Sequence, residues 1–290
     1  MTLTDAQLGH FRDLGYVLLD DVFSPEEVSA LKHDLPALMS DDSPRRVLEK
    51  DGRTVRAIHG CHTTSEAFRR LVRHPRMLGP SAQILGSDVY VHQFKINVKA
   101  AFTGDIWRWH QDFIFWLKQD GMQQPRAVNL MVFLDDVTEF NGPLYVVPRS
   151  HEMGTIDVPP GDAKSDTWRS SFAADLKYAL DRDALAAMVT DYGIASPKGR
   201  TGSVLVTHCN LVHGSPPNMS PFDRVLAIVT YNSVHNALLP VPQPRPEFLV
   251  SRDFTPLTAL DDDALLSYAA GAGSGPAATA FPAAVAAPSQ

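Results

Sequence analysis

Short strand-like segments recur over most of this chain, and they limit the folds that it can adopt. AVNLMVFLDDV (127–137) is almost continuously apolar, as expected for a strand buried on both faces. Strand signals return in SVLVTHC (203–209) and VLAIVTYN (225–232). DVYVHQFKINV (88–98) instead alternates, and one face would carry a partly polar set that indicates either a lined cavity or a solvent-exposed face: Val89, Val91, Gln93, Lys95 and Asn97.

Helical signals stand mainly near the start of the chain. Thr4 with Gln7 resembles a capping box. Ser24-Pro25-Glu26-Glu27 supplies an N-cap, a proline at the first helical position and acid in the first turn. This second motif predicts a helix that runs to about Met39. Many short strands with a few helices favour a mostly β fold, a sandwich or jelly roll with helical buttresses.

We expect a single domain over residues 1–268. Within it, residues 161–192 lose strand character and predict a helical insertion. The last stretch, 269–290, reads AAGAGSGPAATAFPAAVAAPSQ, which has no charged residue and a single aromatic one. Such a composition cannot bury enough apolar surface to order itself, so we predict a disordered tail.

Charge and composition argue against several classes of protein. The net charge is −7 and the chain has no long basic run, which argues against nucleic acid and anionic membrane surfaces as partners. The first residues lack the features of a signal peptide, and the apolar stretches are too short to span a bilayer. Two cysteines indicate a reducing compartment, and we expect a cytoplasmic protein. The sequence contains no signal for the oligomeric state.

A histidine and an aspartate stand two residues apart in the aromatic run WRWHQDFIFW (107–116). His110 and Asp112 would face one cavity if this stretch were extended. They would supply two ligands, and a mononuclear iron site of the facial type needs one more histidine. His208, inside a predicted strand, and His213, in a Gly/Pro-rich loop, are both candidates, although core packing is the competing interpretation for His208.

Arg224 gives His213 additional weight. It follows His213 by eleven residues, at the start of the next strand. Three protein ligands on one face of an iron ion leave the other face open to O2 and a chelating 2-oxoacid. A guanidinium group can bind the distal carboxylate of that acid in a bidentate manner, and the hydroxyl of Ser215 can add a hydrogen bond.

Four ordered motifs resemble the phytanoyl-CoA dioxygenase superfamily of Fe(II)/2-oxoglutarate oxygenases: GYVLLDDVFSPEEV, WHQDFIFWLKQDGM, EFNGPLYVVPRSH and LVHGSPPNMSPFDR. The likeness covers residues 5 to about 255. The resemblance implies a double-stranded β-helix, the cupin-like jelly roll. It implies Fe(II) as cofactor, with 2-oxoglutarate and O2 as co-substrates. Its metal ligands and catalytic centre would be His110, Asp112 and His213. Its 2-oxoglutarate contacts would be Arg224, Ser215, Gln93 and Asn97.

The substrate implied by the resemblance is a small amino acid. VHQFKIN, WHQDFI, DVTEFNGP and RPEFLVSRD are similar to stretches of bacterial enzymes that hydroxylate free L-amino acids, such as leucine or pipecolate, for peptide natural products. Ectoine hydroxylases are also similar, but they carry Glu-Thr-Trp-His where this chain has IFWL (114–117). Halogenases of the superfamily lack the carboxylate, so the presence of Asp112 predicts hydroxylation.

A free amino acid needs a cation for its carboxylate group. Lys95 and Arg56 are the candidates, and Phe113 and Trp116 are candidates for an aromatic substrate pocket. No residue stands out as a partner for the ammonium group.

Three alternatives remain open at this point. The first keeps the enzyme but changes the substrate to ectoine or to an aminoacyl group on a carrier protein. The second is a non-catalytic jelly-roll binding protein. The third is a zinc hydrolase, because zinc also accepts His and Asp ligands, although it leaves Arg224 without a function.

Overall fold

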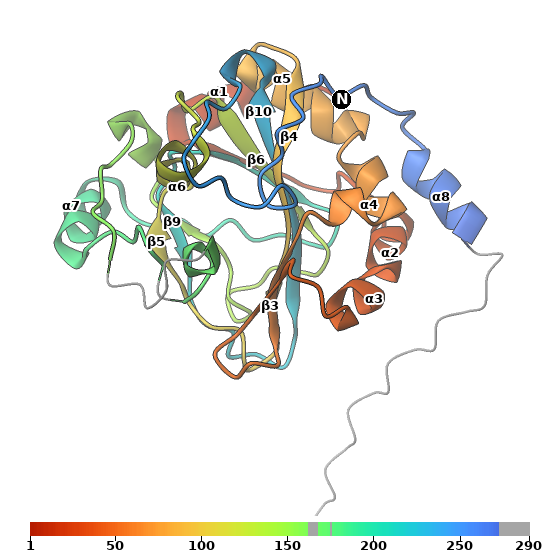
Figure 1. The fold of residues 1–290 in the computed structure, drawn as a ribbon, viewed down its shortest axis with the longest axis horizontal. Coiled ribbons are helices and arrows are strands. Elements are labelled where there is room, and N and C mark those ends of the chain that lie inside the picture. The colour runs from red at the N-terminus through yellow and green to blue at the C-terminus, as the bar shows by residue number, and fades with distance from the viewer. Residues whose placement is uncertain (162–167, 175, 273–290) are drawn as a thin grey trace, which may run out of the picture.

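Two antiparallel sheets form the centre of the protein in a computed structural model, which describes residues 1–161, 168–174 and 176–272 (Figure 1). The larger sheet has seven strands, in the spatial order β1 (Tyr16–Leu19), β8 (Val204–His208), β6 (Ala127–Phe133), β10 (Arg224–Ser233), β4 (Val89–Lys99), β3 (Val55–His59) and β2 (Arg46–Leu48). The smaller sheet has three, in the order β5 (Trp107–His110), β9 (His213–Ser215) and β7 (Tyr145–Val146). The predicted jelly roll is confirmed.

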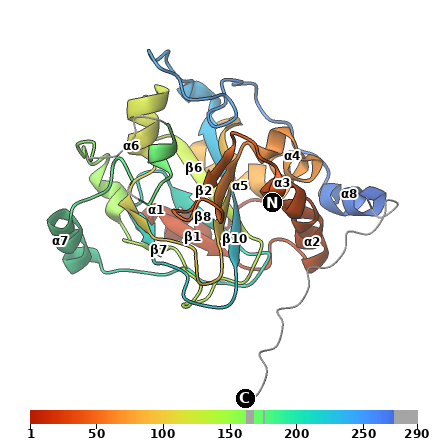
Figure 2. The ribbon, with the colours of Figure 1, turned by 60° about the horizontal axis from the view of Figure 1, so that its bottom comes forward.

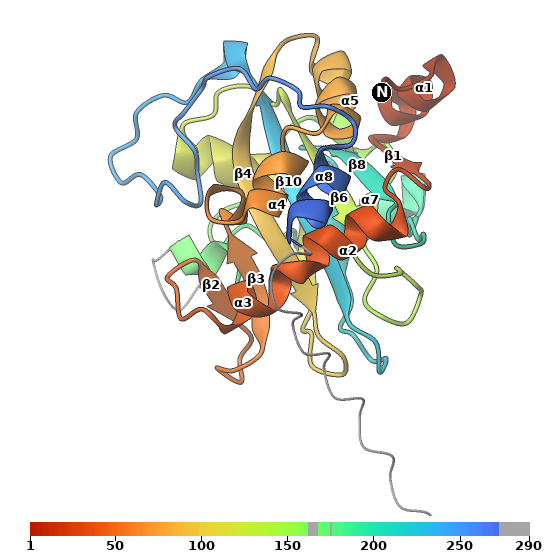
Figure 3. The same cartoon turned by 90° about the vertical axis from the view of Figure 1, so that its right-hand side faces the viewer.

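Helices lie on two sides of these sheets. One group covers the large sheet over β4, β6 and β10 (Figure 3): α2 (Pro25–His33), α4 (Glu66–Leu71), α5 (Pro75–Leu85) and α8 (Ala264–Ala272). Figure 2 shows α6 (Phe113–Phe115) and α7 (Arg182–Tyr192) on the opposite side of the molecule. The remaining helices are α1 (Asp5–Leu14) and α3 (Leu35–Ser40). Single turns are η1 (Cys61–Thr63), η2 (Trp116–Asp120), η3 (Ser150–Met153), η4 (Trp168–Ser171) and η5 (Val234–Asn236).

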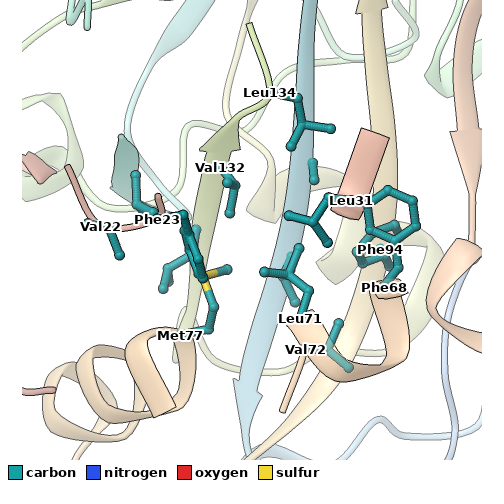
Figure 4. Packing of buried hydrophobic residues seen from close by; sticks show 14 of the residues in the cluster. Val22, Phe23, Leu31, Phe68, Leu71, Val72, Met77, Phe94, Val132 and Leu134 are labelled. Carbon is teal, nitrogen blue, oxygen red and sulfur yellow. The ribbon is translucent and has the colours of Figure 1, made fainter. Parts of the chain in front are cut away.

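The main hydrophobic core lies between the first group of helices and the large sheet (Figure 4). Phe68 and Leu71 of α4 pack in one cluster with Phe94 of β4, and none of the three is exposed to solvent. Burial of each such side chain contributes roughly 1.5–3 kcal/mol. The opposite face of this sheet carries a smaller apolar cluster, which includes Met131, Leu205 and Ile228, together with buried polar residues.

The predicted capping box at Thr4 is present, and the predicted N-cap Ser24 forms a second one with Glu27. The helix predicted to run to Met39 is interrupted, because α2 ends at His33 and α3 begins at Leu35. Pro36 lies in the first turn of α3 and has no backbone N–H to donate, so it suits the start of a new helix and not the interior of a long one.

A β-bulge in β4 corrects the predicted face of that strand. The register with β10 pairs Thr230 with Gln93 but Tyr231 with Val91, so His92 has no partner in the register. Val89 and Val91 therefore lie in the core with Phe94. Gln93 begins the polar face, which Lys95 and Asn97 continue. An extra residue in one strand shifts the alternation of its side chains by one.

The C-terminal helix extends beyond the point where the tail was expected to begin. Residues 269–272 belong to α8, which was not predicted. The helix is held by the buried side chain of Leu265 and by a hydrogen bond of 3.0 Å from Tyr268 Oη to Asp34 Oδ1. Residues 273–290 of the predicted tail lie outside the described residues. Parts of the insertion, 162–167 and 175, lie outside them as well, while η4 and α7 form within it.

Among the described residues, no helix has both the length and the apolar character that crossing a membrane requires.

Candidate metal centre

Three potential metal ligands lie together where the small sheet faces the polar side of the large one. One ligand atom from each of His110, Asp112 and His213 lies within 4.8 Å of the other two. His110 Nε2 is 3.6 Å from Asp112 Oδ1, and His213 Nε2 is 3.9 Å from Asp112 Oδ2. All three residues are buried. The structure thus brings together the three residues that the motifs had indicated.

The backbone reaches this arrangement by a route that differs from our prediction. β5 ends at His110, and Asp112 has helical dihedral angles, φ −70° and ψ −39°. The extended conformation expected for this stretch is therefore wrong. The chain turns here because the Phe113 N–H donates to the carbonyl oxygen of Cys209 at 3.1 Å, which opens the short helix α6. The turn still directs the Asp112 carboxylate towards the two histidines.

Both histidines are oriented as metal ligands. His110 Nδ1 lies 2.7 Å from the Arg108 carbonyl oxygen, and His213 Nδ1 lies 3.0 Å from that of Leu211. A carbonyl oxygen only accepts, so each Nδ1 carries the proton and each Nε2 directs a lone pair towards Asp112. Burial and the nearby His110 lower the pKa of His213 to about 4, so this ring is neutral at physiological pH, as a metal ligand must be.

Asp112 is kept ionised. Burial alone would raise the pKa of its carboxyl group, but the charge of Lys95 and the two histidines outweigh burial and lower that pKa far below its usual range. Asn129 Nδ2 also donates to Asp112 Oδ2 at 2.7 Å. Two imidazoles and one carboxylate form the donor set of a facial-type iron site.

His208, the alternative third ligand, is in a different place. Its ring packs against His151 and Phe11, with centroid distances of 5.2 and 6.3 Å. Its Nδ1 accepts a hydrogen bond from the Asn210 N–H at 3.0 Å, and burial lowers its pKa to about 4. His208 is half-buried and lies outside the cluster of three potential ligands, so the structure does not support it as the third metal ligand.

Several buried hydrogen-bond donors near the centre have no acceptor. Arg224 donates from Nη1 to Asn97 Oδ1 at 3.1 Å and from Nη2 to the Gly142 carbonyl oxygen at 2.8 Å. Its Nε has no hydrogen-bond partner among the described residues, and neither do Ser215 Oγ and Gln93 Nε2. Each unpaired buried donor costs about 1–3 kcal/mol, so these donors suit an anionic ligand such as a 2-oxoacid. Burial lowers the pKa of Arg224 to about 9, which leaves it charged at neutral pH.

Gly142 is required for this arrangement. Its φ of +74° is unfavourable for other residues, and an added Cβ would lie 3.0 Å from the Pro216 carbonyl oxygen. The Asn141-Gly142 turn therefore places the Gly142 carbonyl group against the Arg224 guanidinium.

A small cavity lies beside the three potential ligands. Besides His110 and Asp112, its walls are formed by Gln93, Lys95, Trp107, Phe115, Trp116, Ser171, Phe172 and Arg245. Trp116, a predicted pocket residue, therefore lies at the wall of this cavity. Phe113 is not one of the residues that line the cavity, whereas its neighbour Phe115 is.

The two cations predicted to bind a substrate carboxylate differ in their surroundings. Lys95 lines the cavity. Arg56 does not, since its Nη1 is 3.0 Å from Glu49 Oε2, its Nη2 donates to the Ile106 carbonyl oxygen at 2.7 Å, and its Nε donates to that of Phe172 at 2.8 Å. All three nitrogens are occupied, so Arg56 has a structural function and its assignment to the substrate was wrong.

Arg245 is a cavity residue that sequence reasoning missed. Its Nε lies 2.7 Å from Asp120 Oδ1, and its Nη2 lies 2.5 Å from Asp120 Oδ2. The remaining Nη1 is buried and has no partner among the described residues. Arg245 opens the stretch RPEFLVSRD and Asp120 opens D-G-M, two motifs that we used for the resemblance alone. Asp120 and Arg245 are 125 positions apart in the sequence, so no short motif predicts that they form an ion pair.

The chain is similar to known proteins along most of its length. The profile of the family described as Phytanoyl-CoA dioxygenase (PhyH) matches residues 11–226. The chain is 40% identical over 265 residues to an L-proline trans-4-hydroxylase of Streptomyces griseoviridis, covering 91% of this chain and 98% of that protein. It is 38% identical over 258 residues to an ectoine dioxygenase of Nocardia farcinica, covering 87% and 86%.

Solved structures show the same relationship. The crystal structure of EctD from S. alaskensis with 2-oxoglutarate and 5-hydroxyectoine superposes with a TM-score of 0.77 and 32% identity, covering 89% of this chain and 87% of that one. A structure of EctD with bound Fe gives a TM-score of 0.75 over the same shares of the two chains.

Proposed function

Because this chain belongs to the phytanoyl-CoA dioxygenase (PhyH) family, we propose that it hydroxylates a small free amino acid. The protein is a 2-oxoglutarate-dependent dioxygenase that uses iron, as its relatives and its His-Asp-His cluster together indicate.

The proposed iron ligands are His110, Asp112 and His213. Their support is the convergence of three buried ligand atoms, with both imidazoles oriented through Nδ1. Fe(II) bound there, with 2-oxoglutarate and O2, would supply the oxidation that converts a substrate C–H into C–OH and yields succinate and CO2. The protein would hold the substrate and exclude water, which suits the aromatic walls of the cavity.

The proposed 2-oxoglutarate subsite extends from the iron ligands to Arg224. Its distal carboxylate would accept hydrogen bonds from Arg224 and Ser215, whose free donors support this role. Gln93 and Asn97 would complete the subsite. Asn97 Oδ1 already orients the guanidinium, and Gln93 lies at the wall shared with the cavity.

The proposed substrate class rests mainly on one observation, which is that two cationic side chains line the same aromatic cavity. Lys95 and Arg245 both line the cavity beside Asp112, and the buried donor Arg245 Nη1 has no partner in the described part of the chain. A substrate carboxylate would satisfy both, which favours a free amino acid. An aminoacyl group on a carrier protein is disfavoured, because its carboxylate has become a thioester. We favour a leucine-like aliphatic or a cyclic amino acid, with L-proline foremost because a relative of 40% identity is an L-proline hydroxylase.

Ectoine is the second candidate substrate. It is also a cyclic amino acid with a carboxylate, and ectoine dioxygenases are 35–38% identical to this chain. Ectoine is placed second because the polar residues Glu, Thr and His of those enzymes are replaced here by Ile114, Phe115 and Leu117. We also propose that the hydroxylated product is a building block of a peptide natural product, on the similarity of the motifs to enzymes with that role.

A substrate panel tests this proposal. Purified protein would be incubated with Fe(II), 2-oxoglutarate, O2 and one of L-proline, L-pipecolate, L-leucine or ectoine, while succinate and product mass are measured. We expect one member to give succinate and a product heavier by one oxygen atom, with Asp112→Ala as the inactive control. No succinate with any member would contradict the proposal and favour a binding protein. Turnover without O2 and 2-oxoglutarate would favour a hydrolase.

A further inference from the structure

A row of polar side chains crosses the large sheet beside the metal centre. Thr230 on β10 is the direct register partner of Gln93 on β4 and of Asn129 on β6. Asn129 is in turn the partner of Thr207 on β8. Directly opposed residues in antiparallel strands point to the same face, so all four side chains face the small sheet. Each of them is at most 5% exposed.

Two hydrogen bonds within this row end on Asp112. Thr230 Oγ1 donates to Asn129 Oδ1 at 2.6 Å, and Asn129 Nδ2 donates to Asp112 Oδ2 at 2.7 Å. The direction of both bonds is fixed by chemistry, because an ionised carboxylate can only accept. The amide must therefore turn its NH2 group to Asp112 and its oxygen to Thr230, whose hydroxyl holds it in that orientation.

The bond from Asn129 makes the two carboxylate oxygens unequal. Oδ2 accepts the hydrogen bond from Asn129. Oδ1 accepts no hydrogen bond from the described residues, and the nearest group of the cluster to it is His110 Nε2, at 3.6 Å. A carboxylate free to rotate could chelate the metal through both oxygens or turn towards the cation of Lys95. The open coordination positions of a facial-type site depend on its carboxylate binding through one oxygen.

We propose that Asn129 and Thr230 are positioning residues that fix the Asp112 carboxylate so that Oδ1 is presented to the metal. This inference rests on the proposed function, because it takes His110, Asp112 and His213 as metal ligands. Hydrogen-bonding partners behind a metal ligand commonly change metal affinity by 10- to 100-fold when they are removed. Thr230 acts through Asn129 and does not touch the ligand.

Metal binding to the apoprotein provides the test. Mn(II) would be titrated at fixed pH, and the free ion would be followed by its electron paramagnetic resonance signal. Asn129→Leu keeps the volume but removes the donor, and we expect its Mn(II) affinity to fall by about 10- to 100-fold. Thr230→Val removes the hydroxyl that orients the Asn129 amide, and its Mn(II) affinity should fall by a smaller factor. Thr230→Ser restores the hydroxyl and should recover most of the wild-type affinity.

Thr207→Val is the matched control. Thr207 is the other strand neighbour of Asn129 and is equally buried, but its Oγ1 has no hydrogen-bond partner among the described residues. We expect this variant to bind Mn(II) like the wild type. Thermal unfolding of each apoprotein identifies any variant that fails to fold. If Asn129→Leu does not fold, the comparison of Thr230→Val with Thr230→Ser still decides the test.

Affinities within about twofold of the wild type for both Asn129→Leu and Thr230→Val would overturn the inference, as would an equal loss in Thr207→Val. Failure of the proposed function has a different signature. Wild-type protein that binds Mn(II) but forms no succinate with any substrate, while the variants still lose affinity, would contradict the hydroxylase and support the positioning role.

Discussion

His110 and His213 are direct cross-strand partners on the antiparallel strands β5 and β9, and their ring centroids lie 4.3 Å apart. Register in the small sheet therefore sets the spacing of the two imidazoles, which belong to distant parts of the chain. The turn after β5 adds Asp112 between them. The pairing of the two strands thus fixes the relative positions of the two histidines. Substitutions at five residues near the metal centre test the functions proposed for them.

Arg224→Lys tests the anion subsite. Lysine keeps the positive charge but cannot bind Asn97, Gly142 and a carboxylate with one planar group. The loss of a charged hydrogen bond, worth about 1.5–3 kcal/mol, should raise KM for 2-oxoglutarate by roughly 10- to 150-fold and leave KM for the amino acid little changed. Steady-state kinetics with each substrate varied in turn measures both. An unchanged KM for 2-oxoglutarate would place the co-substrate elsewhere.

Ser215→Ala should give a weaker effect of the same kind. Its hydroxyl is neutral, so a loss of about 0.5–1.5 kcal/mol predicts an increase of roughly 2- to 12-fold in KM for 2-oxoglutarate. Because Ser215 Oγ has no partner among the described residues, the substitution breaks no bond in the protein itself. The apoprotein should therefore keep its thermal stability, and a clear fall in the melting temperature would argue that the hydroxyl has a structural role instead.

Lys95→Met tests the substrate cation. Lys95 lines the cavity and forms no salt bridge with another described residue, although its charge helps to keep the pKa of Asp112 low. We expect KM for the amino acid to rise by at least about tenfold, as for the loss of one charged hydrogen bond, while KM for 2-oxoglutarate stays within about twofold. The two KM values, measured in the same assay, distinguish this outcome from a general loss of activity. Equal rises in both would exclude Lys95 as a specific substrate contact.

Arg56→Met is the contrasting variant. Arg56 and Glu49 form a buried ion pair with N–O distance 3.0 Å, and the guanidinium stacks 3.9 Å from the Trp107 ring centroid. Removal of one partner of such a pair costs about 3–5 kcal/mol because the other charge stays buried. Denaturant unfolding should show that loss, whereas KM for the amino acid should be unchanged in the folded fraction. A normal stability with a raised KM would restore Arg56 as a substrate ligand.

Lys99 predicts a pH dependence of stability. Burial, followed by the charges of Arg224 and Arg56, lowers its pKa from 10.5 to about 6, although Glu49 and Asp105 act in the opposite direction. Between these two values the unfolded chain holds a proton that the folded apoprotein has released, so folding becomes more favourable as pH rises. This contribution is about 1.4 kcal/mol per pH unit.

The substitution Lys99→Met removes that contribution. The difference in unfolding free energy between wild type and variant should therefore shift in favour of the wild type as the pH of the apoprotein is raised from 7 to 9. Denaturant titrations at three pH values would measure it. Parallel dependences for the two proteins would show that Lys99 is charged in the folded state.

Local patterns were sufficient to predict much of the fold. The capping boxes at Thr4 and Ser24 depend on side chains three residues apart, and the strand signals of β4, β6, β8 and β10 depend on short-range alternation or apolarity. The three potential ligands were also identified in advance, although Asp112 reaches its place through a turn and not an extended strand.

Features that depend on distant contacts could not be predicted. The bulge at His92 arises from pairing with β10, and it decides which residues of β4 face the cavity. Arg56 and Arg245 are both arginines in motif-rich stretches, yet one has all its nitrogens occupied and the other keeps one free. Only the partners supplied by the fold distinguish them. Asn129 belongs to an apolar strand, and its bond to Asp112 has no signal in the sequence.

The central claim is that His110, Asp112 and His213 hold one iron ion. Its most direct test is an anomalous difference map at the iron absorption edge, from crystals grown without oxygen in the presence of Fe(II) and 2-oxoglutarate. We predict a single strong peak bounded by His110 Nε2, His213 Nε2 and Asp112 Oδ1, with 2-oxoglutarate extending from it to Arg224. A peak at any other place in the chain, or no peak there at full iron loading, would contradict the claim.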